Sequence, residues 1–225
     1  MTSLLLEWFK VLGLPRSTFV VLLLLLLVWA APSLVINSVN SFDHQLLDAF
    51  IQHIPYGLGS FLLVIYKLSG VHFTGILVLA VLFFFALKRF WQDLICLVFG
   101  TGGILVIVDQ ILKPWFDRPR PGGSLLALTG RSFPSGHAAG SVVFYFMSCT
   151  IIAAHYPRLR GPLFVLSSLW VALVWSSTLY SRAHWPSDIL AGAAVGYVWL
   201  SFCLAGFTVW ERNYLSLSKR SSNGL

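Results

Sequence analysis

Long apolar stretches, separated by short polar segments, constrain this chain more than any other feature. They can be drawn as six membrane spans at about residues 17–36, 72–87, 91–112, 138–155, 162–180 and 187–210. About 20 apolar residues cross a hydrocarbon core about 30 Å thick. A mean hydropathy of +0.82 and a charged fraction of 10% agree with burial in lipid. We therefore predict an all-α fold, an integral membrane six-helix bundle. It forms a single domain over 1–225, with its core at about 17–210 and a short cytoplasmic tail at 211–225.

The segment between the first two spans has a different pattern. Over residues 42–54, apolar residues recur at helical spacing, with Asp43 and Asp48 between them. This pattern predicts an additional interfacial helical segment lying on the membrane surface. Residues 56–69 are apolar but short, which favours an interfacial or re-entrant helix over a seventh span. The span at 72–87 is also short, and either starts earlier or is enclosed by protein.

The few charged residues gather in three polar islands at 113–121, 131–137 and 181–188. Ionisable residues near lipid cost free energy, so by default they are interpreted as functional. Lysine, arginine, serine and two histidines at the ends of membrane helices predict a site for an anionic group, with phosphate as the best match. The net charge of +7 does not form a solvated basic patch, so no nucleic-acid partner is predicted.

In the first island, Lys113 ends an apolar run and prolines stop the helix. Lys113 offers a compact charge, and Arg120 offers a planar fork that binds two phosphate oxygens. The alternative role for both is anchoring at lipid headgroups. Asp117 and Arg118 could pair with one another. Asp109, one turn before Lys113, is either a buried partner of the lysine or a group that supports the site.

In the second island, Ser135 and Gly136 stand directly before an apolar helix. Serine is a favoured N-cap, and glycine lets the backbone approach a ligand. The free N–H groups and positive end of a helix bind phosphate. His137 at that end can donate a proton. The alternative is a capped helix with an incidental histidine.

In the third island, His184 and Asp188 are four residues apart. A carboxylate can hold one ring nitrogen of a histidine and leave the other free as a nucleophile. The carboxylate also stabilises the cation that forms after attack. The alternative is a structural pair at the interface.

The distribution of basic residues predicts the orientation. With the N-terminus in the cytoplasm, all three islands fall on the non-cytoplasmic side. The only basic residue outside the islands on that side is Lys67, which is a positive-inside pattern. The cytoplasmic segments then carry Lys10, Arg16, Lys88, Arg89, Arg158, Arg160, Arg212, Lys219 and Arg220.

These motifs resemble those of a known family. Lys113, six residues, then Arg120-Pro121; the run from Pro134 to His137; and His184, three residues, then Asp188 are similar to the three signature motifs of the type 2 phosphatidic acid phosphatase superfamily. That superfamily includes lipid phosphate phosphatases, polyprenyl diphosphate phosphatases, glucose-6-phosphatases and soluble haloperoxidases.

The resemblance covers about residues 17–210 and implies a metal-independent phosphoryl transfer without a cofactor. His184 is the nucleophile, His137 protonates the leaving oxygen, and Lys113, Arg120, Ser135 and the Gly136 amide neutralise the phosphate oxygens.

The third motif departs from the family pattern, because Thr178 occupies the position of the usual arginine. If the helix continues, Arg182 lies one turn further on the same face and can supply the missing phosphate ligand. Arg118 and Arg131 are the other candidates. The alternative is that Arg182 only anchors the helix end.

The predicted function is therefore that of an integral membrane lipid phosphatase, a hydrolase of the non-cytoplasmic leaflet that forms a phosphohistidine. Phosphatidic acid, phosphatidylglycerol phosphate and a polyprenyl diphosphate such as undecaprenyl diphosphate all stay open as substrates, and so does the oligomeric state. The alternatives are a lipid phosphotransferase using the same intermediate and a catalytically weak lipid-binding or scrambling relative.

Overall fold

The computed structural model describes residues 10–36 and 41–222, and every regular element in these ranges is a helix. The all-α class is thereby confirmed. The elements are α2 (Leu14–Ile36), α3 (Ser41–Gln52), α4 (Tyr56–Leu68), α5 (Val71–Leu87), α6 (Trp91–Leu105), the π-helix η1 (Val106–Leu112), α7 (Lys113–Phe116), α8 (Gly136–His155), the 3₁₀-helix η2 (Pro157–Leu159), α9 (Arg160–Tyr180) and α10 (Pro186–Ser222).

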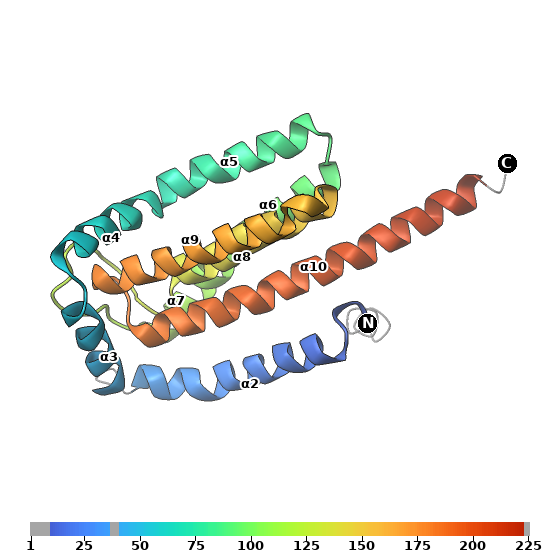
Figure 1. The fold of residues 1–225 in the computed structure, drawn as a ribbon. Coiled ribbons are helices and arrows are strands. Elements are labelled where there is room, and N and C mark those ends of the chain that lie inside the picture. Colours follow the sequence, from blue (N-terminus) through green and yellow to red (C-terminus); the bar gives the residue numbers. More distant parts are fainter. Residues whose placement is uncertain (1–9, 37–40, 223–225) are drawn as a thin grey trace.

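The axes of the long helices are roughly parallel to one another, and α3 crosses one end of the bundle (Figure 1). Helix α8 lies at the centre and packs against α6, α9 and α10, whereas α4 packs against α9. The principal neighbour of α2 is α10. Helix α2 is therefore attached to the rest of the bundle mainly along the side that faces α10.

The number of membrane-spanning helices is not confirmed as six. Four helical stretches within the described residues are long and apolar enough to cross a bilayer: Trp91–Phe116, Gly136–His155, Pro157–Tyr180 and Pro186–Trp210. A fifth is added only if α3 and α4 form one broken span. Helix α5 has 17 residues and a length of about 26 Å, below the thickness of a typical hydrocarbon core.

The segment predicted to be interfacial forms two helices. Helices α3 and α4 meet at 115°, and α5 then follows α4 along one side of the bundle (Figure 1). Asp43 and Leu47 on α3 are buried. The polar residue Asp43 therefore points into the protein.

Close contact between α8 and α10 brings two of the polar islands together. A Cβ added at Gly192 would lie 2.4 Å from the carbonyl oxygen of Ser135, and one at Gly196 would lie 2.7 Å from that of Ala139. Small residues four apart allow membrane helices to approach this closely. The N-terminal ends of the two helices are consequently adjacent.

Candidate active site

The three polar islands meet at the end of the bundle that α3 crosses (Figure 1). Backbone hydrogen bonds connect them. The Ser132 N–H donates to the Arg118 carbonyl over 2.8 Å, and the Ser135 N–H donates to the Asp188 carbonyl over 3.0 Å. Segments more than 50 residues apart in the sequence thus form one site, as the sequence predicts.

Lys113 stands where the π-helix η1 gives way to α7. Short π-helical segments within α-helices often occur at functional sites. The Lys113 Nζ donates to Asp109 Oδ1 over 2.6 Å. Asp109 is 42% exposed, so it is a partner of the lysine at the rim and is not buried.

Ser135 and Gly136 form the start of α8 beside this lysine. The Ser135 Oγ accepts from the Ala138 N–H over 3.2 Å, which makes Ser135 the N-cap. A Cβ at Gly136 would lie 3.6 Å from Lys113 Nζ. The lysine and the helix N-terminus therefore face a common space, as expected for an anion site.

His184 is fully buried, and its ring is oriented by a backbone carbonyl. Its Nδ1 lies 2.9 Å from the Ser132 oxygen. A carbonyl can only accept, so Nδ1 carries the proton and Nε2 keeps its lone pair. Asp188 Oδ2 lies 3.6 Å from the same Nδ1, which is too long for a hydrogen bond. Ser132, which is not among the predicted site residues, therefore orients the ring, and Asp188 adds a negative charge beside it.

Burial determines the charge state of His184. Burial lowers the pKa of His184 below its ordinary value of 6.5, and the nearby charges of Arg120 and Lys113 lower it further, while Asp188 raises it. The imidazole is consequently neutral at neutral pH. Only the neutral ring has a free lone pair for attack on phosphorus.

Asp188 is held from two sides. Its Oδ2 accepts from the Trp185 N–H over 2.9 Å, and its Oδ1 accepts from the Arg118 guanidinium over 2.6 Å. Arg118 is also bound to Asp43 Oδ2 over 2.6 Å. Ser187 donates its N–H and its hydroxyl to the carboxylate of Asp43. All four side chains are buried.

The sequence patterns do not predict this buried network. The suggested pairing of Asp117 with Arg118 is wrong, because Asp117 contacts Arg131 instead. Asp43 is separated from Arg118 by 75 residues. The only sequence signal for Asp43 was its place in the first turn of an amphipathic helix. Aspartates are common at exposed helix ends, so this signal did not indicate burial.

Arg120 and its neighbours line a polar cleft of about 570 Å³. Arg120 donates to the Ala183 carbonyl over 2.7 Å, which holds it next to His184. Among the described residues, the cleft is lined by Asp109, Lys113, Asp117, Arg118, Pro119, Arg120, Thr129, Gly130 and Arg131. Two of the predicted phosphate ligands thus lie in one cleft, and Arg131 joins them.

Arg182 has a different environment from the one expected. The premise that the helix continues through it is wrong, because α9 ends at Tyr180 and Arg182 has a φ of 53°. Its guanidinium donates to Asp48 Oδ1 over 2.8 Å. Thr178, at the usual arginine position, is buried and donates to the Trp175 carbonyl. Arg182 is not among the described residues that line the polar cleft.

His137 lies in the first turn of α8 and faces the nucleophile candidate. The ring centroids of His137 and His184 are 6.1 Å apart, and the ring of Tyr66 from α4 lies 5.2 Å from that of His137. The two imidazoles are therefore close enough to act on one bound phosphoryl group.

An apolar groove of about 610 Å³ begins beside these groups. Its wall includes Leu112, directly before Lys113, and Phe133 and Pro134, directly before Ser135. The remaining wall residues come from α2, η1, α7 and α10 and are Leu24, Leu27, Ile107, Trp115, Phe116, Ala191, Val195, Val198, Trp199 and Phe202. Hydrocarbon chains attached to a phosphate in the site would have an apolar surface to contact.

Comparison with known proteins agrees with the motifs. Residues 94–212, more than half of the chain, match the model of the PAP2 superfamily. Phosphatidylglycerophosphatase B of Bacillus subtilis (strain 168) is 29% identical over 201 residues, which cover 86% of this chain and 94% of the relative. The crystal structure of a transmembrane PAP2-type phosphatidylglycerolphosphate phosphatase from Bacillus subtilis aligns with a TM-score of 0.73 and 23% identity, covering 82% of this chain and 93% of that one. The predicted resemblance is thereby confirmed, and this chain, with its several apolar helices, belongs to the PAP2 superfamily.

Proposed function

We propose that this protein is an integral membrane lipid phosphatase that hydrolyses a lipid phosphomonoester through a phosphohistidine at His184. One observation carries the proposal. The Nδ1 of His184 is bound to the Ser132 carbonyl, which leaves Nε2 as a free, neutral nucleophile near Lys113 and Arg120. A binding protein has no need for an imidazole held in this tautomer.

In the first step, His184 Nε2 attacks phosphorus and the phosphorus–oxygen bond to the lipid breaks. His137, protonated beside the negative charge of the bound phosphate, gives its proton to the departing oxygen, so the lipid leaves as an alcohol. The new phosphoimidazole carries a positive charge on its ring. Asp188, 3.6 Å from Nδ1, stabilises that charge.

In the second step, neutral His137 takes a proton from water, and the hydroxide attacks phosphorus. The phosphorus–nitrogen bond breaks, inorganic phosphate leaves, and His184 returns to its neutral form. No metal is needed in this cycle, because Lys113, Arg120, Ser135 and the Gly136 amide neutralise the phosphate oxygens. We place Arg182 outside this set because its guanidinium is bound to Asp48.

The apolar groove beside the site supports a substrate with hydrocarbon chains. Phosphatidylglycerol phosphate is the first candidate, because the Bacillus subtilis relative is a phosphatidylglycerophosphatase. The positive-inside pattern of the loops supports a site that opens to the non-cytoplasmic side. The substrate would then come from the outer leaflet of the membrane that holds the protein.

The test is release of inorganic phosphate by purified protein in detergent. The substrates are phosphatidylglycerol phosphate, phosphatidic acid, undecaprenyl diphosphate and glycerol 3-phosphate, each with and without EDTA. We expect turnover of the first without loss in EDTA, and no turnover by His184→Ala. A loss on chelation that Mg²⁺ restores would refute the metal-free cycle. Equal turnover of glycerol 3-phosphate would refute a need for lipid chains.

A phosphotransferase uses the same intermediate but passes the phosphoryl group to an alcohol. Adding diacylglycerol or a polyprenol to the same assay and analysing the lipid products separates the two activities. Transfer that exceeds hydrolysis would replace the phosphatase assignment while leaving the roles of His184 and His137 unchanged.

A further inference from the structure

A second large cleft runs along the side of the bundle, from Val142 and Leu190 near the catalytic end to Arg16 and Arg160 at the opposite end. Its volume is about 940 Å³, larger than the polar cleft or the apolar groove of the catalytic end. It is lined by α2, α8, α9, α10 and the segment before α2. It exists because α2 packs mainly against α10 and leaves its other side open.

The interior of this cleft suits hydrocarbon. Its walls carry aromatic residues such as Phe19, Phe146 and Phe164, with Ala153 and Ala194 making room between them. Three polar side chains in the wall already have intramolecular partners: Thr150 and Ser201 donate to the carbonyls one turn earlier, and Trp175 donates to Ser141. Most of the remaining wall is apolar, so an acyl chain would be buried there.

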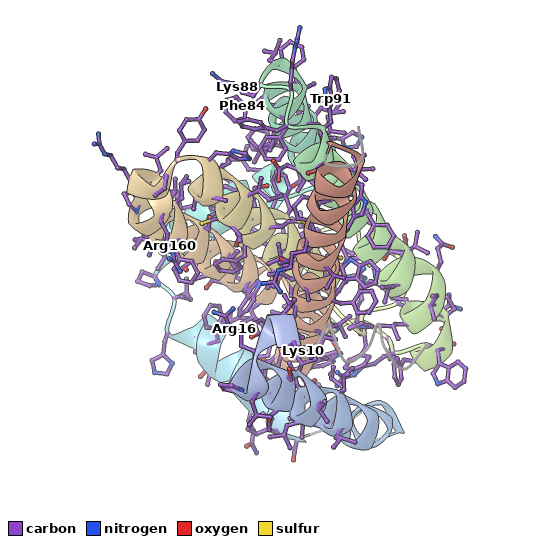
Figure 2. All side chains as sticks on the ribbon, turned by 90° about the vertical axis from the view of Figure 1, so that its right-hand side faces the viewer. Lys10, Arg16, Phe84, Lys88, Trp91 and Arg160 are labelled. Atoms are coloured by element: carbon purple, nitrogen blue, oxygen red, sulfur yellow. The ribbon has the colours of Figure 1, made fainter. Side chains whose placement is uncertain are left out.

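The mouth of the cleft is basic. Arg16 from α2 and Arg160 from the start of α9 both line it, and both are exposed. Viewed from this end of the bundle, they lie on neighbouring sides of the cleft, and Lys88 lies at a distant corner (Figure 2). Among the described residues, no carboxylate is paired with either arginine. Two guanidinium groups without an acidic partner match a phosphate or another anionic headgroup.

We propose that this cleft binds an anionic phospholipid as a non-substrate ligand, with its headgroup between Arg16 and Arg160 and its chains between α2 and the helix pair α8–α9. The bound lipid joins α2 to the rest of the bundle. The two arginines are at the far end of the bundle from His184, and neither takes part in the proposed catalytic cycle.

The probe is dioleoyl phosphatidylglycerol, with dioleoyl phosphatidylcholine as the zwitterionic control. Binding to the purified full chain is measured by native mass spectrometry across a lipid titration. We expect preferential binding of phosphatidylglycerol. A basic residue near an anionic headgroup contributes about five-fold in affinity, so Arg16→Gln with Arg160→Gln should lower the affinity for phosphatidylglycerol about twenty-five-fold. Lys88→Gln removes a charge at the same end and should leave binding unchanged.

A second variant tests the apolar part without changing charge. Ala153→Trp fills the cleft and should weaken phosphatidylglycerol binding while both arginines remain. Glycerol 3-phosphate at millimolar concentration should not compete, because it lacks chains. Catalytically inactive His184→Ala should bind the lipid as the unmodified chain does, which separates this site from the substrate site.

Three results would overturn the proposal. The first is equal binding of the two lipids. The second is unchanged binding by the double arginine variant, provided that it elutes as a folded species in size-exclusion chromatography. The third is competition by glycerol 3-phosphate, which would indicate a free phosphate site instead of a lipid site.

Discussion

Arg118 donates to Asp188 over 2.6 Å, and the two side chains are 1% and 0% exposed. The same guanidinium binds Asp43, so one cation lies between two buried carboxylates. The rings of Trp185 and Phe133 lie 5.7 and 6.0 Å from its central carbon. Because Asp188 also lies beside His184, Arg118 connects α3 to the candidate nucleophile.

Arg118 should consequently be a positioning residue. Arg118→Gln leaves two buried carboxylates without a cation, which destabilises a protein by about 3–5 kcal/mol. It also frees Asp188 to turn away from His184, so kcat should fall about ten- to a hundred-fold with little change in KM. Arg118→Lys should recover part of kcat, because a point charge cannot contact both carboxylates as the fork does. Thermal unfolding in detergent and phosphate-release kinetics provide the two measurements.

The control is Arg131→Gln. Arg131 also has an aspartate partner, Asp117, but the two side chains are 44% and 73% exposed. Exposed pairs of this kind contribute about 0–1 kcal/mol. Stability losses of the same size in both variants would contradict a specific role for the buried pair.

The buried His184 predicts a pH dependence of stability. The folded-state pKa lies below the unfolded value of 6.5, so the unfolded chain binds more protons as the pH falls. The contribution is therefore fully present above pH 6.5 and is lost as the pH falls from there through the folded pKa. His184→Gln should flatten this acid-side decline in melting temperature. The charged groups facing His184 are Asp188, Arg120 and Lys113, and all three remain in the variant. An unchanged profile would show that other groups cause the decline.

The helices were largely predictable because hydrocarbon thickness limits their length. The predicted spans at 138–155 and 162–180 correspond to Gly136–His155 and Arg160–Tyr180. What local patterns cannot give is the packing between distant segments. The turn after Tyr180 places Arg182 in the left-handed region, so Arg182 does not lie one helical turn beyond Thr178. Backbone conformation at one residue therefore decided where that guanidinium lies.

The candidate site was predictable to the extent that each motif carries its own chemistry. Ser135 as an N-cap follows from neighbouring residues. The predicted helix end at Lys113 is wrong by about one turn, because the helix continues through Pro114 to Phe116. The partner of Nδ1 in His184 is the carbonyl of Ser132, 52 residues earlier. Every residue has a carbonyl, so no side-chain type marks this position. The role of Asp43 could not be predicted for a related reason, since its contact with Arg118 requires α3 to cross the end of the bundle.

The apolar groove predicts that substrate chain length matters. Val195→Trp narrows the groove beside Phe133 and should lower kcat/KM for dioleoyl phosphatidic acid about ten-fold or more, since burying one CH₂ contributes about 0.8 kcal/mol. A water-soluble phosphomonoester such as p-nitrophenyl phosphate should be hydrolysed unchanged. The control is Val165→Trp on the exposed face of α9, where Val165 is 58% exposed. Equal losses for both substrates would indicate a damaged catalytic centre instead of a blocked groove.

The ion pair of Arg182 with Asp48 predicts a small effect on catalysis. Arg182→Ala should change kcat/KM by less than about three-fold, because the guanidinium is occupied away from the polar cleft. Lys113→Ala in parallel should lower kcat/KM about ten- to a hundred-fold, the effect of a lost charge-assisted hydrogen bond. A loss with Arg182→Ala as large as with Lys113→Ala would mean that Arg182 leaves Asp48 and binds the phosphate. Asp48→Ala would then raise activity by releasing it.

The last prediction concerns which side of the membrane the site faces. Gly122 lies in the exposed loop between the first two islands, and Gly161 lies at the other end, in the first turn of α9; no heavy atom lies within 4 Å of a Cβ built at either position. The native Cys96, Cys149 and Cys203 are free and buried, so they should react slowly. With the N-terminus in the cytoplasm, Gly122→Cys should react with a membrane-impermeant maleimide added to intact cells or spheroplasts. Gly161→Cys should react only after permeabilisation. The reverse result would place the candidate site in the cytoplasm, and the substrate would then come from the inner leaflet.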